Sequence, residues 1–423
     1  MKTVGRIALG ALALFVLLIV LIVAVNFRDE PSLPKEPQRF ASNPTLVERG
    51  AYLARAGNCA ACHTPRGGAP LAGGLGIETP FGTVYSSNIT SDETTGIGAW
   101  NSAEFFRAMH NGRSRDGRLL YPAFPYPNYT QITREDSDAI YAYLKSVAPV
   151  KQANRPHTLR FPYNTQPSLA VWRAMFFDPG VYRPDTSKTA QWNRGGYLVR
   201  GLGHCNACHG GRNLLGATSE KLEMSGGLIP MQKWYAPALT SSREAGVADW
   251  DTNHVVELLK NGVSPRGSVM GPMAEVVYRS TQYVSTDDLL AMAVFLKQLP
   301  QAEEPHPPDK PLPRDPAVMD KGGKVYEKNC AQCHGDKGEG APGAYPALAG
   351  NRAVTMPSTA NLVRVVVSGG YLPSTGGNPR PYGMPPYNQT LDDSQIAAVL
   401  SFIRLSWGNE APAVSQLEVL QFR

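Results

Sequence analysis

The chain has 423 residues, too many for one ordinary domain, so its length predicts two to four compact units. Its formal charge of +6 is small and no basic run stands out, which argues against a nucleic-acid-binding protein. The 41 glycines and 36 prolines favour modest helices joined by many turns over a long helical bundle.

The chain opens with a nearly unbroken apolar run from Ile7 to Val25, with Lys2 and Arg6 before it. A run of this length is typical of a transmembrane helix. A secretory signal peptide is the alternative, but its apolar core is usually shorter and ends at a small-residue cleavage site, of which LIVAVNF is a poor example. We therefore predict an uncleaved anchor over residues 1–28 and a linker over residues 29–43, with the bulk of the chain outside the cytoplasm.

All six cysteines fall in three copies of the motif Cys-x-x-Cys-His. The copies consist of Cys59, Cys62 and His63; Cys205, Cys208 and His209; and Cys330, Cys333 and His334. This motif is the attachment signature of haem c. The spacing places both sulfurs on one side of a helical turn, where they can bond to the two vinyl groups of one haem, and the His supplies a nitrogen to the iron.

A Cys-x-x-Cys pair can also form a redox disulfide or half of a zinc site. Three copies, each followed directly by His and with no cysteine left over, favour haem over both alternatives. We therefore predict three covalently bound haem c groups, each with a proximal His on its iron.

The three motifs lie in three copies of one repeated unit, which predicts a mainly α fold of three tandem class I cytochrome c domains behind the N-terminal helix. Each copy has a helix before the motif, a second helix ending at a glycine turn, and a last helix opened by an acidic capping turn. Gly50, Gly195 and Gly322 lie in the first helices, where another helix could cross closely. The predicted segments are domain 1 at 44–155, a connector at 156–188, domain 2 at 189–300, a Pro-rich linker at 301–315, domain 3 at 316–410 and a tail at 411–423.

The first two copies share a long loop, because the segments from Tyr85 to Trp100 and from Tyr235 to Trp250 have equal length. We expect the two tryptophans to pack as aromatic side chains, the alternative being that they donate hydrogen bonds to haem carboxylates. The linker at 301–315 is predicted to be a semi-rigid strap that holds neighbouring haems close.

The sixth iron ligand is predicted from the loop before each last helix. A Met sulfur opposite the His raises the potential of a haem, which suits electron transfer. In domain 3 the sequence YGMPPY offers Met384, and in domain 2 the sequence VMGPMAEVV offers Met270 and Met273. Counting back from the last helix favours Met273, so Met273 and Met384 are the predicted ligands.

In domain 1 the same count lands on Phe124, and a phenyl ring cannot bind iron. Either the first haem has an open or water-bound sixth position, or its ligand comes from elsewhere. Aligning the glycine turns of the second helices places Met109 opposite Leu259 and Val366, so Met109 is the first candidate. His110 is the second, although its register predicts that it faces outward. The alternative for both is an ordinary structural role.

The motifs PFGTVYSSNIT, GIGAW, FFRAMHNG, LYPAFPYPNYTQIT and MPPY resemble those of the triple-haem cytochrome c subunits of bacterial membrane-bound alcohol, aldehyde and gluconate dehydrogenases. The resemblance covers roughly residues 40 to 408. It implies a subunit on the periplasmic face of the inner membrane that takes electrons from a catalytic partner and passes them to ubiquinone.

Two features are less like the alcohol and gluconate branches, which usually carry Met where Phe124 stands and attach through a C-terminal amphipathic region. A retained N-terminal helix and Phe124 are more similar to the cytochromes of molybdopterin and iron-sulfur dehydrogenases. We therefore expect a molybdopterin aldehyde dehydrogenase with an iron-sulfur subunit as partner, with a quinoprotein alcohol dehydrogenase or a flavin gluconate dehydrogenase as alternatives.

No substrate pocket, nucleophile or general base is evident, so we predict an electron carrier without its own catalytic site. The rival hypothesis is a haem peroxidase or gas sensor that uses an open first haem.

Overall fold

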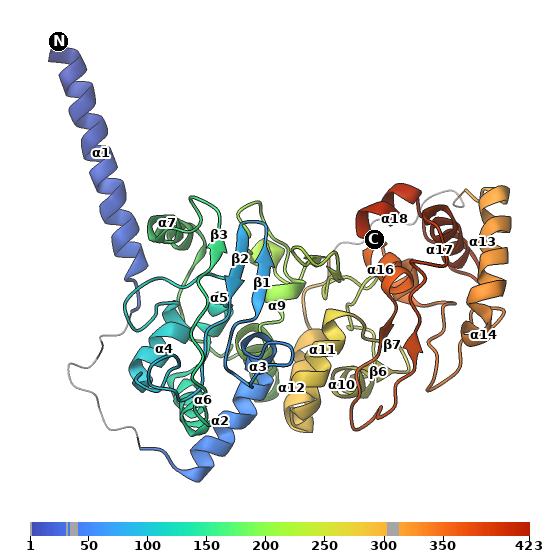
Figure 1. Ribbon diagram of the computed structural model, residues 1–423, viewed down its shortest axis with the longest axis horizontal. Helices are drawn as coiled ribbons and strands as arrows, with labels where there is room; N and C mark the ends of the chain where they lie inside the picture. Colours follow the sequence, from blue (N-terminus) through green and yellow to red (C-terminus); the bar gives the residue numbers. More distant parts are fainter. Residues whose placement is uncertain (1, 31–32, 34–40, 303–312) are drawn as a thin grey trace. The chain divides into compact units, whose positions relative to one another are not determined.

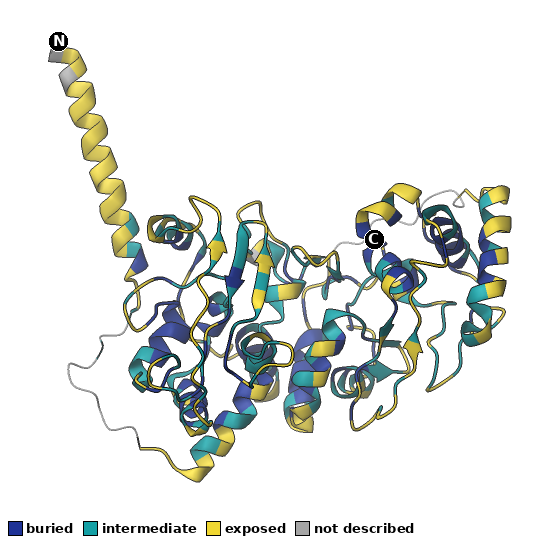
Figure 2. Ribbon diagram, in the orientation of Figure 1, coloured by how far each residue is buried: buried dark blue, intermediate teal, exposed yellow. Residues whose placement is uncertain are grey.

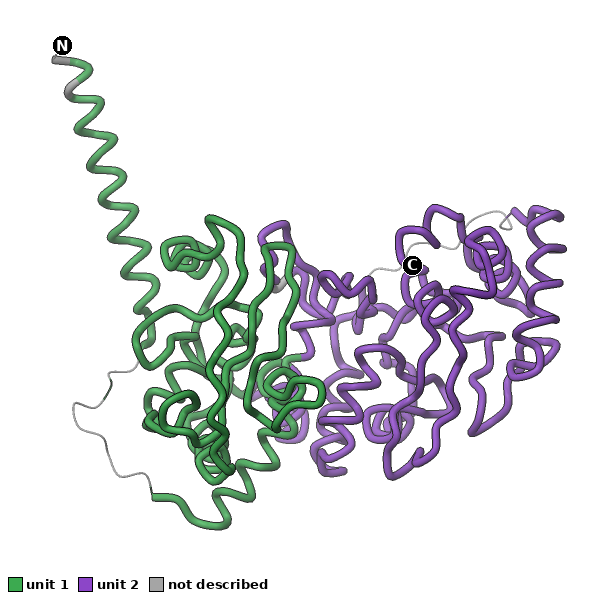
Figure 3. Tube along the Cα trace, in the orientation of Figure 1, with its two compact units in different colours: residues 1–184, 200–204 green, residues 185–199, 205–423 purple. Residues whose placement is uncertain are grey.

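The computed structural model describes residues 2–30, 33, 41–302 and 313–423 (Figure 1). The chain divides into two compact units (Figure 3): unit 1 comprises residues 1–184 and 200–204, and unit 2 comprises residues 185–199 and 205–423. Unit 1 contains the first predicted domain, and unit 2 holds most of the second together with the third. Most of the linker at 29–43 and of the strap at 301–315 lies outside the described residues, so the strap stays a prediction.

α1 (Lys2–Asn26) is a continuous helix whose side chains are exposed along most of its length (Figure 2). Its stretch Arg6–Asn26 is long and apolar enough to cross a membrane, and no other helix among the described residues meets this criterion. A signal sequence near the N-terminus would meet it too, so α1 fits either an anchor or a signal peptide.

The predicted order of three helices is present in every copy. The helices are α2 (Pro44–Ala56), α4 (Ser102–Asn111) and α6 (Arg134–Ser146); α8 (Ala190–Gly196), α10 (Thr252–Asn261) and α12 (Thr286–Lys297); and α13 (Pro316–Asn329), α16 (Ala360–Ser368) and α17 (Asp393–Leu405). The motifs lie on three short helices, α3 (Cys59–His63), α9 (Asn206–His209) and α14 (Ala331–His334). A π-helical turn over Tyr197–Leu202 leads from α8 toward the second motif. The chain is therefore mainly helical, as predicted.

In each copy the first helix crosses the last at a glycine, as predicted. A Cβ atom added to the glycine would meet a carbonyl oxygen of the last helix: Ala139 at 1.8 Å from Gly50, Ala291 at 2.0 Å from Gly195, and Ala398 at 2.2 Å from Gly322. Real Cβ atoms do not approach an oxygen this closely, so only glycine permits these crossings.

The sequence signals at the helix ends also act as predicted. The last helices begin at side-chain caps that accept from a backbone N–H three residues on: Thr133 from Asp136, Ser285 from Asp288, and Asp392 from Gln395. α4 and α10 end at Gly112 and Gly262, which have φ values of 58° and 76°. That left-handed conformation is the one glycine adopts at least cost.

Short antiparallel strands join the helices. β1 (Gly76–Thr79), β2 (Gly82–Tyr85) and β3 (Thr158–Leu159) form a three-stranded sheet in unit 1, with Ile77 opposite Val84. Unit 2 has three two-stranded pairs: β4 (Gly227–Leu228) with β5 (Tyr235–Ala236), β6 (Val263–Ser264) with β7 (Gly267–Ser268), and β8 (Gly370–Tyr371) with β9 (Gly383–Met384).

The segments predicted as a connector at 156–188 and a tail at 411–423 are integral parts of their units. The connector supplies β3 and α7 (Gln166–Phe176), and α7 contacts α1. The predicted tail at 411–423 forms α18 (Gln416–Phe422), and its Val419 is fully buried in the core built around α16 and α17. The tail folds onto domain 3 because its apolar side chains fill that core, which periodicity over so few residues did not reveal.

The remaining short helices lie in the loops. They are α5 (Tyr126–Tyr129), η2 (Glu220–Leu222), α11 (Pro272–Arg279), η3 (Thr281–Tyr283) and α15 (Arg352–Thr355). α5 follows Phe124, which stands where a methionine ligand was sought in domain 1, and α11 contains Met273, the predicted ligand in domain 2.

Candidate functional site

The motif histidines are held in the same way in all three copies. In each case the ring Nδ1 lies within hydrogen-bond distance of a backbone carbonyl oxygen: His63 and Ser87 at 2.6 Å, His209 and Pro237 at 2.7 Å, and His334 and Pro346 at 3.0 Å. A proton on Nδ1 that is donated to this carbonyl leaves Nε2 with a free lone pair. Metal-bound histidines in proteins are usually oriented by such a bond.

Burial lowers the pKa of His63, His209 and His334, and the hydrogen bond to the carbonyl opposes this shift in each case. The neutral imidazole is therefore favoured near pH 7 in all three. A neutral ring is the form that coordinates iron, so the local environment suits an axial ligand.

A glycine completes each proximal loop. The carbonyl oxygen of the motif histidine accepts from Gly73, Gly226 and Gly340 at 2.8, 2.7 and 2.8 Å, respectively. The three glycines have φ values of 72°, 77° and 67°, and a Cβ on any of them would meet backbone atoms within 2.6 Å. These residues were not predicted from the sequence, because they follow the histidine at ten, seventeen and six positions and share no fixed spacing.

No disulfide joins any of the six motif cysteines in the structure, and the described residues contain no group of three or more His, Cys, Asp or Glu side chains that could hold a metal ion. The choice of haem over a disulfide or zinc rests on the motif and its repetition.

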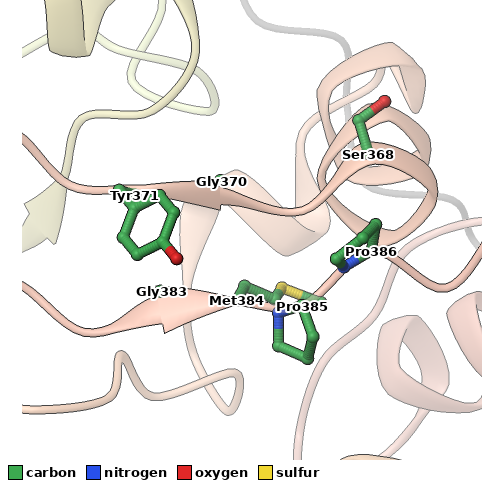
Figure 4. Close-up of a pocket in the computed structure, with 7 residues that line it drawn as sticks. All are labelled: Ser368, Gly370, Tyr371, Gly383, Met384, Pro385 and Pro386. Atoms are coloured by element: carbon green, nitrogen blue, oxygen red, sulfur yellow. The ribbon is translucent and has the colours of Figure 1, made fainter.

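Met384 lies on β9 and lines a pocket with Tyr371 and Gly370 of β8 (Figure 4). It also packs against the core of domain 3, and so does Cys330 of the third motif. The structure thus brings the predicted ligand and the third motif to one hydrophobic cluster.

Met273 lies in the first turn of α11 and packs against Val269, Ala274 and Val277 together with Leu258 of α10. Met270 points elsewhere, because its Cε is 3.9 Å from the position of a Cβ on Gly370. The choice of Met273 over Met270 as the sixth ligand stays a prediction.

In domain 1 aromatic rings occupy the place of the methionine loop. The rings of Phe124 and Tyr129 lie 5.4 Å apart, and the Tyr129 hydroxyl donates to the Gly57 carbonyl at 2.9 Å, two residues before Cys59. Burial, followed by the nearby Cys59 and Cys62 thiols, raises the pKa of Tyr129. Phe124 therefore lies beside a side chain that reaches the first motif.

Domain 3 has an equivalent hydrogen bond between a loop tyrosine and the backbone next to the motif. The Tyr387 hydroxyl donates to the carbonyl of Asn329, the residue directly before Cys330, at 2.6 Å. Neither Tyr129 nor Tyr387 was predicted as a site residue. The sequence signal that could have identified them is a tyrosine shortly after the position of the sixth ligand. Tyr129 follows Phe124 by five residues, and Tyr387 follows Met384 by three.

Met109 and His110 are both buried in α4, at 6% and 5% exposure. Met109 matches Leu259 and Val366, which are both 8% exposed. The outward position expected for His110 is wrong: its Nδ1 lies 2.6 Å from the Thr130 carbonyl oxygen, and its ring stacks on Phe106 at 5.0 Å. Register alone could not show this, because the Thr130 carbonyl that holds the ring lies outside α4.

Trp250 has a buried indole N–H that could donate a hydrogen bond to a bound group. Its side chain is 5% exposed, and its buried indole N–H has no hydrogen-bond partner. The guanidinium groups of Arg352 and Arg266 lie 5.0 and 5.5 Å from the ring centre. An unpaired buried donor beside two cations fits a carboxylate such as a haem propionate, which supports the alternative role considered for this tryptophan.

Comparison with known proteins agrees with this chemistry. The family model described as cytochrome c matches residues 47–148 and 319–407. The cytochrome c subunit of a quinone alcohol dehydrogenase from Komagataeibacter europaeus is 40% identical over 403 residues, which cover 90% of this chain and 85% of that protein. The cytochrome c subunit of gluconate 2-dehydrogenase from Pantoea cypripedii is 38% identical and covers 88% of both chains.

A subunit of nicotinate dehydrogenase from Pseudomonas putida is 40% identical over 400 residues. The match covers 93% of this chain and 33% of that protein. The similarity therefore extends to a polypeptide about three times as long as the matched region.

Proposed function

Because the chain belongs to the family of cytochrome c subunits of dehydrogenases, we propose that it is a membrane-anchored carrier with three haem c groups that passes electrons from a periplasmic catalytic subunit to ubiquinone. The observation that carries this proposal is the threefold repetition of one proximal geometry around Cys-x-x-Cys-His. The chain is an electron-transfer subunit, and the catalytic site of the complex belongs to a different subunit.

Each haem would supply a reversible one-electron couple. The six motif cysteines would hold the three groups by thioether bonds, and Nε2 of His63, His209 and His334 would coordinate iron. Met273 and Met384 would provide the sulfur ligands of the second and third groups and raise their potentials. Trp250 would donate to a carboxylate of the second group, which would satisfy its unpaired indole N–H.

The anchor is proposed to be α1, which would hold unit 1 at the outer surface of the inner membrane. Ubiquinone, the proposed acceptor, is dissolved in that membrane. The first haem domain belongs to the same compact unit as α1, which supports electron exit from that domain.

For the catalytic partner we propose a molybdopterin aldehyde dehydrogenase with an iron-sulfur subunit. This choice rests on Phe124 and on the N-terminal helix, the two features that set the chain apart from the alcohol and gluconate branches it resembles. The relatives described above are named as parts of alcohol, gluconate and nicotinate dehydrogenases, so each class is a defined alternative.

The experiment is to purify the intact complex and identify its cofactors, then to mix it rapidly with its substrate and follow the haem spectrum. We expect molybdenum in the complex, reduction of haem c by substrate, and reoxidation by a soluble ubiquinone analogue. Pyrroloquinoline quinone or flavin without molybdenum would overturn the choice of partner. Haems that stay oxidised while substrate is consumed would overturn the electron-transfer role itself.

A further inference from the structure

The connector helix α7 is bonded to the last turn of α1. The Asn26 amide is buried, its Nδ2 donates to the Ala170 carbonyl at 2.8 Å, and its Oδ1 accepts from Arg173 Nε at 2.9 Å. Ala170 and Arg173 both lie in α7, which sits beside the end of α1 (Figure 1). The position of α7 is therefore fixed relative to the last turn of α1.

A second set of contacts closes the junction just after the span. Arg28 pairs with Asp178 at 2.7 Å and donates to the Phe177 carbonyl at 3.2 Å, directly after α7. Arg113 pairs with Glu30 at 2.8 Å. Breaking the buried Arg113–Glu30 pair would leave an uncompensated charge, so the segment directly after Asn26 is held firmly.

The surface of α7 away from this junction is apolar. Val171 and Met175 are 41% and 55% exposed and lie one helical turn apart. Trp172 and Phe176 are half-buried beside them, with ring centres 5.6 Å apart. We call these four residues the α7 patch. Arg173 is the one charged residue between Asn164 and Phe177, and it is buried at 3% exposure.

We propose that α7 lies in the interfacial layer of the lipid bilayer, with the α7 patch immersed among the acyl chains. This inference rests on the proposed role of α1 as an anchor. The span Arg6–Asn26 has 21 residues, and at about 1.5 Å per residue it matches a hydrocarbon layer of about 30 Å. Asn26 then lies at the headgroup level, and the helix bonded to it lies there too.

The chemistry of α7 suits this position. An interfacial helix buries one apolar face, and tryptophan is enriched at membrane surfaces. An exposed face with no charge is unusual on a helix surrounded by water. The bilayer is favoured over a protein partner because the membrane is already present at Asn26, whereas a partner would have to reach the same level.

Arg173 also connects α7 to the helix that carries a candidate ligand of the first haem. Arg173 donates through Nη1 to the carbonyl of Asn111 at 2.6 Å, at the end of α4. α4 carries Met109, the candidate ligand of the first haem. The Arg173 side chain therefore links the proposed bilayer-contacting helix to α4.

The proposal is tested with spin labels on the full-length holoprotein in lipid nanodiscs, without its catalytic partner. Single cysteines are introduced as Val171→Cys and Met175→Cys, with Leu214→Cys, 98% exposed in unit 2, as the aqueous control. Power saturation compares the access of oxygen, which concentrates in lipid, with that of a water-soluble nickel chelate. We expect a several-fold higher ratio of oxygen to nickel access at 171 and 175 than at 214.

A fourth label at Leu14→Cys reports on α1 alone. Lipid-like access at 14 with aqueous access at 171 and 175 would overturn the interfacial position of α7 while leaving the anchor intact. Aqueous access at 14 would overturn the anchor and the interfacial position of α7 with it. Protection at 171 and 175 that appears only after the catalytic partner is added would assign the α7 patch to that partner and overturn the bilayer contact.

Discussion

At the scale of single residues, the first predicted domain differs from the other two at the position predicted for the sixth ligand. Phe124 and Tyr129 fill the place of a methionine loop, and Met109 is the buried sulfur whose register matches Leu259 and Val366. In domain 3 the Tyr387 amide donates to the Val366 carbonyl at 3.0 Å, so this helical position adjoins the loop that carries the sixth ligand. The equivalent position in domain 1 is that of Met109, whereas His110 matches Lys260, so the register favours Met109.

Replacing Met109 by Leu should remove one of three His/Met haems, because leucine keeps the volume of methionine but has no sulfur. The near-infrared sulfur-to-iron band should fall from three equivalents to two, while haem attachment stays complete. Met224→Leu is the matched control, since Met224 is fully buried and is not a predicted ligand. An unchanged band in Met109→Leu would contradict the assignment, and His110→Ala would then test the second candidate.

His157 links stability to pH. The backbone N–H of Tyr85 donates to its Nδ1 at 3.1 Å, so this nitrogen must be unprotonated in the folded protein. Burial, followed by the charge of Arg118, lowers the pKa of His157. The unfolded chain then binds the proton more readily, so the contribution to stability is full above about pH 6.5 and is lost as the pH falls toward the lowered folded value.

The measurement is the free energy of unfolding against pH for the wild type and for His157→Phe. We expect stability to fall less steeply with acid in the variant. Parallel curves below about pH 6.5 would show that His157 makes no pH-dependent contribution.

The predictable site residues are those with a contiguous motif or a repeated register. The Cys-x-x-Cys-His residues and the crossing glycines belong to this group. Gly73, Gly226 and Gly340 do not, because the loops between histidine and glycine differ in length. Tyr129 was equally hidden, since its bond to Gly57 joins residues 72 positions apart.

At the scale of elements, a helix could be predicted from the sequence wherever an apolar periodic segment begins at a capping residue and ends at a glycine turn. α7 was not, because its 11 residues show one exposed apolar face with a buried arginine opposite, the reverse of a surface helix. The short strands β4 to β9 have two residues each and leave no alternation to detect. Their pairing depends on contacts made only after the helices have packed.

The crossing of α13 and α17 should fail if the glycine between them gains a methyl group. In Gly322→Ala the new Cβ would lie 2.2 Å from the Ala398 carbonyl oxygen and 2.7 Å from Phe402 Cβ, so the helices must separate. We expect a loss of about 1–3 kcal/mol in the free energy of unfolding of unit 2, the usual cost of overpacking. Denaturant titration followed by circular dichroism measures this loss.

Gly376→Ala is the control, because an added Cβ at Gly376 meets no atom within 4 Å and the residue has no positive φ. This substitution should leave the stability within about 0.5 kcal/mol of the wild type. Equal effects of the two substitutions would mean that the close crossing does not limit the packing of α13 on α17.

At the scale of the whole molecule, unit 2 contains most of the second predicted domain and all of the third, and side-chain hydrogen bonds join the two. Asn361 of α16 accepts from the Tyr235 amide at 2.8 Å and donates to the Tyr235 carbonyl at 2.7 Å. Arg352 donates to the carbonyls of Ser242 and Gly246 at 2.6 and 2.8 Å. These contacts involve described residues on both sides of the strap, so the pairing of the two domains does not depend on the strap alone.

Replacing Asn361 by Ala should loosen this pairing, because both backbone groups of Tyr235 lose their partner at once. Leaving a buried polar group unpaired costs about 1–3 kcal/mol. Interfaces between domains are modest in size and polar, so a loss of this size should weaken the association of the two domains. We expect calorimetry to resolve two unfolding transitions in place of one, and electron equilibration between the second and third haems to slow after flash reduction. Asn388→Ala, at an exposed side chain near Met384, is the control and should change neither measurement.

A single transition and unchanged equilibration in Asn361→Ala would mean that other contacts, such as those of Arg352, suffice to hold the two domains as one body. The measurements distinguish weakened association of the two domains from loss of haem binding. Loss of haem binding would change the absorption spectrum of the resting protein. Weakened association would change only the number of unfolding transitions and the rate of electron transfer between the second and third haems.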